Sequence, residues 1–381
     1  MKKGLVALAV LGAFSGAALA QSSVTMYGIL DVNYMWEEKP TTVGSGTSAR
    51  VQQESTSAIN GGHQSGSRLG FRGTEDLGGG LKAIFDAEMG FDNTTGNLPS
   101  GGRLFHRQVY AGLASDKWGA VVAGRLAAFS SGTGDFDMWG RVDPFSTGFA
   151  LAGLGSTFIS SAALRADNTI AYQTPTWGGF KGGIGYSLNY NGAEVTPSGG
   201  NTKVLMLGGN FTSGPFFVSV TYDAVDYADA TPSRPDQKHL QIGGTFDIGA
   251  FRLHAAFADQ SNISTILAPS GVSSVIGITS GGAVVLPANF SYDNTAWMLG
   301  ATWTMGAFKV FGSYQVSDAD GQTISGKNVE PDYSVWGIGG SYNLSRRTNL
   351  YASYASRDAD GTLLGNQFNY KQLAIGMRHL F

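Results

Sequence analysis

Apolar and polar side chains alternate with a period of two residues over long stretches of this chain. In residues 24–36 one parity is polar and the other is apolar, the apolar set being Val24, Met26, Leu30, Val32, Tyr34 and Trp36. The same alternation recurs in residues 81–91 and 306–316. A period of two is that of a β-strand with one apolar and one polar face. The sequence therefore predicts an all-β protein.

The lengths of the strands and of their connectors narrow the fold further. The alternating stretches run for about ten residues or more, enough to cross a bilayer at a tilt, whereas soluble strands typically have about 5–6 residues. Seven short polar connectors separate them, at 76–80, 115–119, 174–179, 212–215, 247–250, 304–307 and 344–347. One strand on each side of every short turn, plus one at each terminus, gives 16. We therefore predict a 16-stranded antiparallel transmembrane β-barrel with short turns at one end and long loops at the other.

The first twenty residues have the pattern of a signal peptide. Lys2 and Lys3 form a positive segment, residues 4–14 are apolar, and Ala18-Leu19-Ala20 resembles a cleavage site. The apolar segment is shorter than the ~20 residues of a membrane-spanning helix. We expect residues 1–20 to be removed and residues 21–381 to form the barrel domain outside the cytoplasm.

Charge and cysteine content exclude several classes of function. Two of the 25 Lys and Arg residues lie in the signal peptide, so 23 remain against 28 Asp and Glu. This acidic balance argues against a nucleic-acid partner. The chain has no cysteine, which excludes disulfides and zinc-thiolate sites, and no mature apolar run is long enough for a transmembrane helix. We predict no cofactor and no metal site.

Short motifs give little support to an enzyme. The chain contains neither an HExxH pair nor a G-x-S-x-G elbow, and the glycines at 78–80 precede a strand rather than a nucleotide-binding helix. Acidic pairs at 318–320 and 358–360 are interpreted as solvated loop tips, with cations bridging lipopolysaccharide as the alternative. A ligand-specific channel or an adhesin stays open because of the apolar connector 260–292, and a barrel hydrolase is less favoured.

Blocks of sequence along the whole mature chain resemble one known family. SSVTMYGILDVNY at 22–34, SRLGFRGTEDLGGGLKAIFDAEMGF at 67–91, FHRQVYAGL at 105–113 and the terminal GMRHLF resemble the neisserial-type general porins of Gram-negative outer membranes. The resemblance implies a homotrimer in outer-membrane lipid and lipopolysaccharide. It also implies a water-filled channel for passive diffusion of ions and small hydrophilic solutes, with short periplasmic turns and long extracellular loops.

The resemblance also implies that the third long loop folds into the lumen and constricts it. Residues 127–164 form the corresponding connector, and its six aromatic residues provide an apolar side that can dock on the wall. In such porins, arginines on the wall face carboxylates on this loop. By motif position the wall arginines are Arg68, Arg107 and Arg165, and the loop carboxylates are Asp135, Asp137 and Asp143, with Asp143 preferred. The three arginines suggest a weak preference for anions, although some could instead pin the loop.

Parity places a few further residues. Lys82, Asp86 and Glu88 share the polar face of residues 81–91 and are expected to line the lumen. The last strand ends on Phe381, an aromatic residue at the position of an interfacial girdle, and we expect this residue to take part in assembly.

Overall fold

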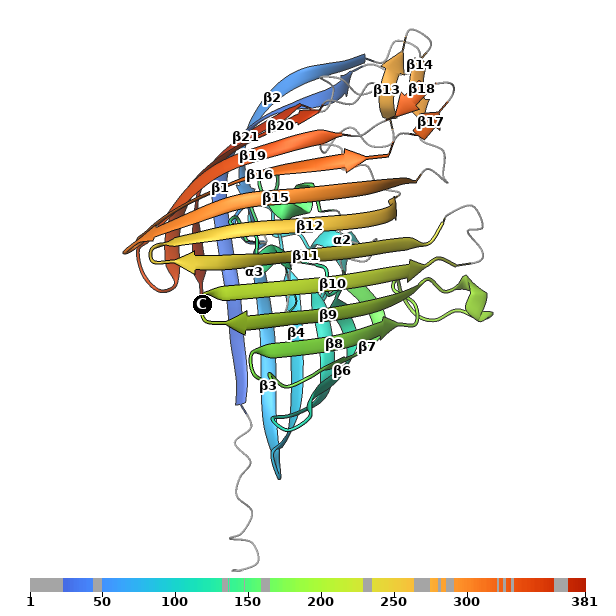
Figure 1. The fold of residues 1–381 in the computed structure, drawn as a ribbon, viewed down its shortest axis with the longest axis vertical. Coiled ribbons are helices and arrows are strands. Elements are labelled where there is room, and N and C mark those ends of the chain that lie inside the picture. The colour runs from blue at the N-terminus through green and yellow to red at the C-terminus, as the bar shows by residue number, and fades with distance from the viewer. Residues whose placement is uncertain are drawn as a thin grey trace, which may run out of the picture.

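A computed structural model of the chain shows one large antiparallel sheet (Figure 1). The residues it describes are 23–43, 50–131, 136, 138–146, 148–158, 165–228, 235–263, 275–279, 282–285, 291–320, 322–324, 327–329, 332–359 and 369–381. The expected signal peptide therefore lies outside the described residues, as do Asp135 and Asp137.

Seventeen described strands belong to the large sheet. They are β1 (Ser23–Val43), β2 (Arg50–Gly61), β3 (Arg68–Gly78), β4 (Leu81–Gly90), β5 (Gln108–Ser115), β6 (Gly119–Ala127), β7 (Arg165–Gln173), β8 (Phe180–Ser187), β9 (Lys203–Ser213), β10 (Phe216–Asp226), β11 (Gln237–Ile248), β12 (Phe251–Ile263), β15 (Tyr292–Met305), β16 (Phe308–Ala319), β19 (Tyr333–Asn343), β20 (Thr348–Ala359) and β21 (Tyr370–Leu380). From β3 onward, each strand pairs with the next one in this series.

The first and last strands close the sheet into a barrel. Residues 29–38 of β1 pair with β21, while the other edge of β1 pairs with β2 over residues 32–43 and with β3 over residues 23–29. β2 and β3 are thus two halves of one barrel strand, interrupted by residues 62–67. The barrel therefore has 16 strands, which confirms the number predicted from the short turns. Closure also pairs the edge backbone groups, which lipid could not hydrogen-bond.

The two faces of the strands differ as the alternation predicted. Exposed large apolar side chains follow one parity, for example Leu299 and Trp297 on β15 and Ile375 on β21. The opposite parity carries buried polar groups such as Gln241, Gln260 and Gln315. The apolar face is therefore turned to lipid and the polar face to the interior, as in a transmembrane barrel.

The connectors have the predicted asymmetry. All seven short turns named above join consecutive barrel strands at one end. Two small hairpins, β13 (Val275–Thr279) with β14 (Gly282–Val285) and β17 (Gln322–Ile324) with β18 (Lys327–Val329), lie at the opposite end, beyond the barrel strands (Figure 1). Short helical turns, α2 (Pro99–Gly102) and η3 (Ser198–Gly200), also belong to long connectors.

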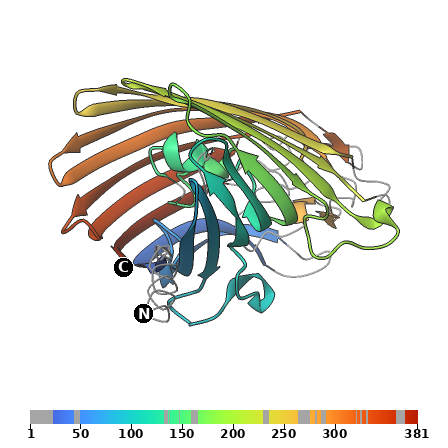
Figure 2. The ribbon, with the colours of Figure 1, turned by 90° about the horizontal axis from the view of Figure 1, so that it is seen from below.

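The third long connector lies inside the barrel. It contains the helical turns α3 (Met138–Arg141) and η2 (Leu154–Ser156), and Figure 2 shows its green ribbon within the ring of strands. Its side chains Phe136, Phe145 and Phe158 are almost completely buried. The inward-folded third loop is thereby confirmed, and each of the three buried apolar clusters among the described residues combines side chains of this loop with side chains of the inner wall.

Candidate functional site

Two of the predicted wall arginines meet at one carboxylate. Arg107 donates a hydrogen bond from Nε to Oε1 of Glu88, and Nη1 of Arg68 lies 3.8 Å from the same oxygen. Glu88 is buried on the lumen face of β4, and Tyr27 donates to its Oε2 at 3.1 Å. Among the described residues, the carboxylate that these two arginines share is therefore one of the wall itself.

Parity explains how local structure brings these groups together. In the β3–β4 register Arg68 faces Gly90, and Glu88 lies two residues before Gly90 on the same face of β4. Arg107 precedes the first residue of β5, the strand that pairs Gln108 with Glu88. Sequence reasoning expected Glu88 to line the lumen but did not foresee that it would pair with both arginines.

Arg165 lies at the start of β7, in the same positive region. It interacts electrostatically with Arg107, Arg125 and Glu88, and its Nε is buried without a hydrogen-bond acceptor among the described residues. The neighbouring His106 lies in the connector before β5. Its partial burial, together with the charges of Arg107, Arg165 and Arg125, lowers the pKa of this imidazole. Burial contributes most to this lowering, and the three positive charges act in the same direction.

A second carboxylate near the start of β7 was missed by sequence reasoning. Asp167 forms ion pairs with Arg125 at 2.5 Å and with Arg103 at 3.0 Å. The β6–β7 register shifts between Gly124 and Leu126, which is an irregularity that a period of two cannot predict. Because of this irregularity, parity counted from the centre of the strand gives no reliable position for Arg125 or Asp167.

Asp143, the preferred loop carboxylate, is occupied by its own loop. The side chain is buried, Phe145 donates its N–H to Oδ1 at 2.9 Å, and Leu154 donates its N–H to Oδ2 at 2.7 Å. These bonds hold the two ends of the loop tip together. These contacts do not require Asp143 to face the wall arginines across the lumen.

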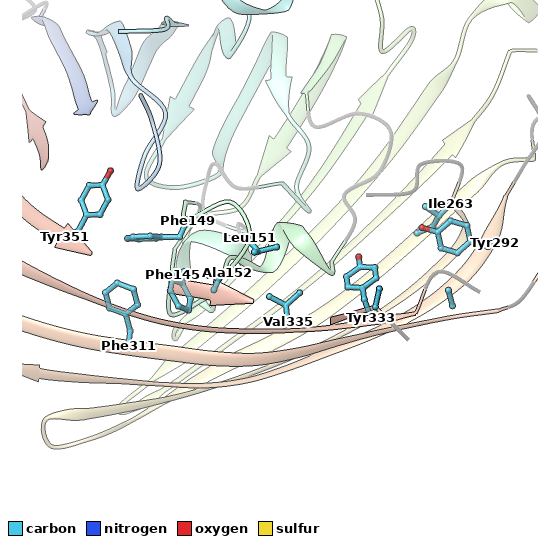
Figure 3. Packing of buried hydrophobic residues seen from close by; sticks show 13 residues of the cluster. Phe145, Phe149, Leu151, Ala152, Ile263, Tyr292, Phe311, Tyr333, Val335 and Tyr351 are labelled. Atoms are coloured by element: carbon cyan, nitrogen blue, oxygen red, sulfur yellow. The ribbon is translucent and has the colours of Figure 1, made fainter. Parts of the chain in front are cut away.

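Aromatic side chains dock the loop on the wall formed by β16, β19 and β20 (Figure 3). Phe145 makes an edge-to-face contact with Phe311 at 5.0 Å between ring centroids, and Phe149 contacts Phe311 and Tyr351 at 5.5 Å. Polar bonds support the same contact, since Gln315 donates to the carbonyl of Ala152 at 2.6 Å. The loop therefore has the expected apolar side, and this side packs on the wall.

The interruption between β2 and β3 also contacts the loop tip. Phe149 donates its N–H to the carbonyl of His63 at 2.5 Å, and the His63 ring lies edge-on to the Phe149 ring. A Cβ on Gly148 would come within 1.9 Å of the carbonyl oxygen of Gln64, so only glycine fits at this approach. The segment 62–67 between β2 and β3 and the tip of the third loop are thus packed against each other.

The remaining predicted residues lie on the wall. Asp86 accepts a hydrogen bond from Tyr27 at 3.0 Å on the lumen face, and Lys82 pairs with Asp116 at 3.5 Å near a short turn. Phe381 exchanges backbone hydrogen bonds with Gly28 at 3.0 and 3.1 Å. It thus extends the β21–β1 pairing to the last residue of the chain.

This geometry, a closed barrel narrowed by an inner loop beside an arginine-rich wall, agrees with comparisons to known proteins. The family model for Gram-negative porins matches residues 7–362. The chain belongs to the Gram-negative porin family. It is 34% identical to an outer membrane porin protein of Bordetella pertussis over the full length of both chains. It is also 31% identical to the major outer membrane protein P.IB of Neisseria meningitidis over 57% of each chain. The resemblance to neisserial-type porins is thereby confirmed.

A solved structure gives the same architecture. The anion-selective porin from Comamonas acidovorans matches with a TM-score of 0.70 at 22% identity, covering 95% of this chain and all of that chain. As a porin, this protein is an outer-membrane channel for passive diffusion, and its family is one of channels rather than of enzymes. Among the described residues, no group of three or more His, Asp or Glu side chains is arranged to hold a metal ion.

Proposed function

We propose that this general porin passes small hydrophilic anions in preference to cations, through a constriction formed by the third loop and the wall around Glu88. The observation that carries the proposal is the convergence of Arg68 and Arg107 on the single carboxylate Glu88, with Arg165 beside them. One carboxylate cannot neutralise three guanidinium groups. The wall therefore keeps an excess of positive charge that attracts anions and repels cations.

The net charge of the surrounding wall is also positive. Asp167 is shared by two more arginines, Arg103 and Arg125, and Asp86 accepts from a neutral tyrosine hydroxyl. With Arg72, which lies opposite Asp86 in the β3–β4 register, six guanidinium groups of the wall stand against the three carboxylates Asp86, Glu88 and Asp167, and they stay in excess by one when Asp135 and Asp137 of the loop are added. The anion-selective porin of similar fold supports the same preference by analogy.

The reversal potential in a salt gradient tests this proposal. With purified protein in a planar bilayer and a tenfold KCl gradient, the sign of the reversal potential should indicate anion preference. Arg165→Gln and Arg107→Gln should each shift it toward the cation side. Arg346→Gln, in a short turn, is the matched control because it removes one positive charge at a distance from the wall. An unchanged potential in both wall variants would refute the role of these arginines.

The proposal includes two further features. The first is that the functional unit is a homotrimer of the chain without residues 1–20. The second is that Asp135 and Asp137 face the wall arginines, while Asp143 maintains the conformation of the loop. Mass spectrometry of the mature protein and light scattering in detergent test the first feature. For the second, Asp135→Asn or Asp137→Asn should increase anion preference. Asp143→Asn should instead change channel noise, since it weakens the bonds to Phe145 and Leu154.

A further inference from the structure

The segment 62–67, which separates β2 from β3, is longer than a continuous strand requires. Only residues 30 and 31 of β1 lie between its pairings with β2 and β3, whereas the other side of the ladder has all six residues of the segment. A regular antiparallel ladder has one residue opposite each residue of its neighbour. The backbone of Gly62 still bonds to β1, and that of Ser67 bonds to the residue after β4. The residues in excess are therefore 63–66.

These extra residues lie inside the barrel and cross two strands. Ser65 donates its N–H to Oδ2 of Asp31 on β1 at 2.7 Å, and its Oγ accepts a hydrogen bond from Arg378 on β21 at 3.0 Å. Nε2 of His63 forms a 2.9 Å hydrogen bond with Oγ of Ser353 on β20, the strand beyond β21. Asp31 and Ser353 are buried polar residues of the lumen-facing parity. The segment is therefore fastened to the inner wall across three strands.

One end of the segment supports the tip of the third loop. Phe149 donates its N–H to the carbonyl of His63 at 2.5 Å, and the carbonyl of Gln64 leaves no room for a Cβ on Gly148. Gln64 is itself held in place, because Asn349 on β20 donates to its Oε1 at 2.9 Å. The loop tip therefore rests on a stretch of backbone that the wall holds in position.

The other end of the segment contacts the wall arginines. Arg68 donates from Nε to the carbonyl of Gly66 at 3.0 Å, and a Cβ on Gly66 would lie 3.6 Å from Nη1 of Arg107. These are the two arginines that share Glu88. One short segment thus contacts both the loop tip and the arginines, and the separation of these two parts of the channel depends on its conformation.

We propose that the segment 62–67 is a second constriction element, which sets the size limit for solutes together with the third loop. The diameter of a pore decides which hydrophilic solutes pass, and buried hydrogen bonds that are costly to break keep this segment in place. Gln64 and Gly66 are only half-buried. The segment has no Lys, Arg, Asp or Glu, so its effect is on size and does not depend on the proposed preference for anions.

Deletion of residues 63–66 tests the proposal, because it places Gly62 opposite Asp31 and Ser67 opposite Leu30 in a continuous strand. Liposome swelling compares the entry of the trisaccharide raffinose with that of the pentose arabinose. The deletion should raise the rate for raffinose relative to arabinose severalfold, and it should increase the single-channel conductance in KCl. A folded deletion variant with a lower thermal midpoint but an unchanged ratio of the two rates would show a purely structural role and overturn the inference.

A point variant keeps the test valid if the deletion variant does not fold. His63→Ala removes the bond to Ser353 and the ring beside Phe149, and should raise the same ratio by a smaller factor. Thr348→Ala is the matched control, because it removes a 2.9 Å bond between β20 and His379 of β21 next to a short turn, and should leave the ratio unchanged. An equal ratio in His63→Ala and Thr348→Ala would overturn the inference, whereas cation preference in a KCl gradient would refute only the proposed function.

Discussion

The hydroxyl of Tyr351 on β20 donates a 2.6 Å hydrogen bond to Oδ1 of Asp31 on β1. Strand β21 lies between them, and the tyrosine ring crosses it over Gly376, where a Cβ would come within 2.4 Å of the ring. Asp31 also accepts the N–H of Ser65 at 2.7 Å. One buried carboxylate thus joins the closing seam of the barrel to the interruption between β2 and β3.

Removal of the Tyr351 hydroxyl should weaken the seam. Tyr351→Phe removes the side-chain donor from Oδ1 of the buried Asp31 carboxylate and leaves the bond from Ser65, and the loss of one such donor typically costs about 1–3 kcal/mol. The expected result is a lower thermal midpoint in detergent, followed by circular dichroism. Tyr354→Phe on the same strand is the control, because its ring packs on Trp336 at the lipid face. Equal midpoints for the two variants would contradict the role of this bond.

The same arrangement recurs on the other side of β1. The ring of Tyr27 crosses β3 over Gly70, where a Cβ would lie 2.3 Å from Cζ, and its hydroxyl reaches Asp86 and Glu88 on β4. Gly70→Ala should displace the ring and destabilise the barrel by about 1–3 kcal/mol. Gly209→Ala is the matched control, because its Cβ would meet Phe180 at an ordinary 3.7 Å. Urea midpoints of the two folded variants compare the effects, and a control as unstable as Gly70→Ala would argue against this steric explanation.

The aromatic docking of the third loop should steady the current through the channel. Phe149→Ala removes the ring between Phe311, Tyr351 and His63 and should cost about 3–5 kcal/mol. We expect more open-channel noise in single-channel recordings, because the loop tip loses its main apolar contact. Phe257→Ala, at the lipid face, should leave the noise at the level of the unmodified protein. A quiet Phe149→Ala channel would show that other contacts suffice to hold the loop.

Much of the fold could be predicted from the sequence because a membrane barrel repeats one simple rule. Leu373 and Ile375 alternate with Gln372 and Ala374 as lipid and lumen demand, and short turns such as 76–80 mark the strand ends. The interruption at residues 62–67 could not be predicted, because two halves of one strand show the same period as two separate strands. Only the pairing of both halves with β1 reveals it.

The site was predictable in its residue types but not in its pairings. Motif position identified Arg68 and Arg107, and parity identified Glu88, yet the ion pairs among them depend on side-chain reach across β3, β4 and the connector before β5. Asp143 shows the converse difficulty. An acid before a proline in a loop has the same appearance in sequence whether it faces a channel or binds backbone N–H groups, as it does here.

The central claim is that this chain forms an open, passive pore, and single-channel conductance tests it most directly. Purified, folded protein added to a planar bilayer in symmetric KCl should insert in discrete steps whose current rises linearly with voltage. Barrel protein with the correct circular dichroism spectrum that inserts into the bilayer without conducting ions would contradict the account.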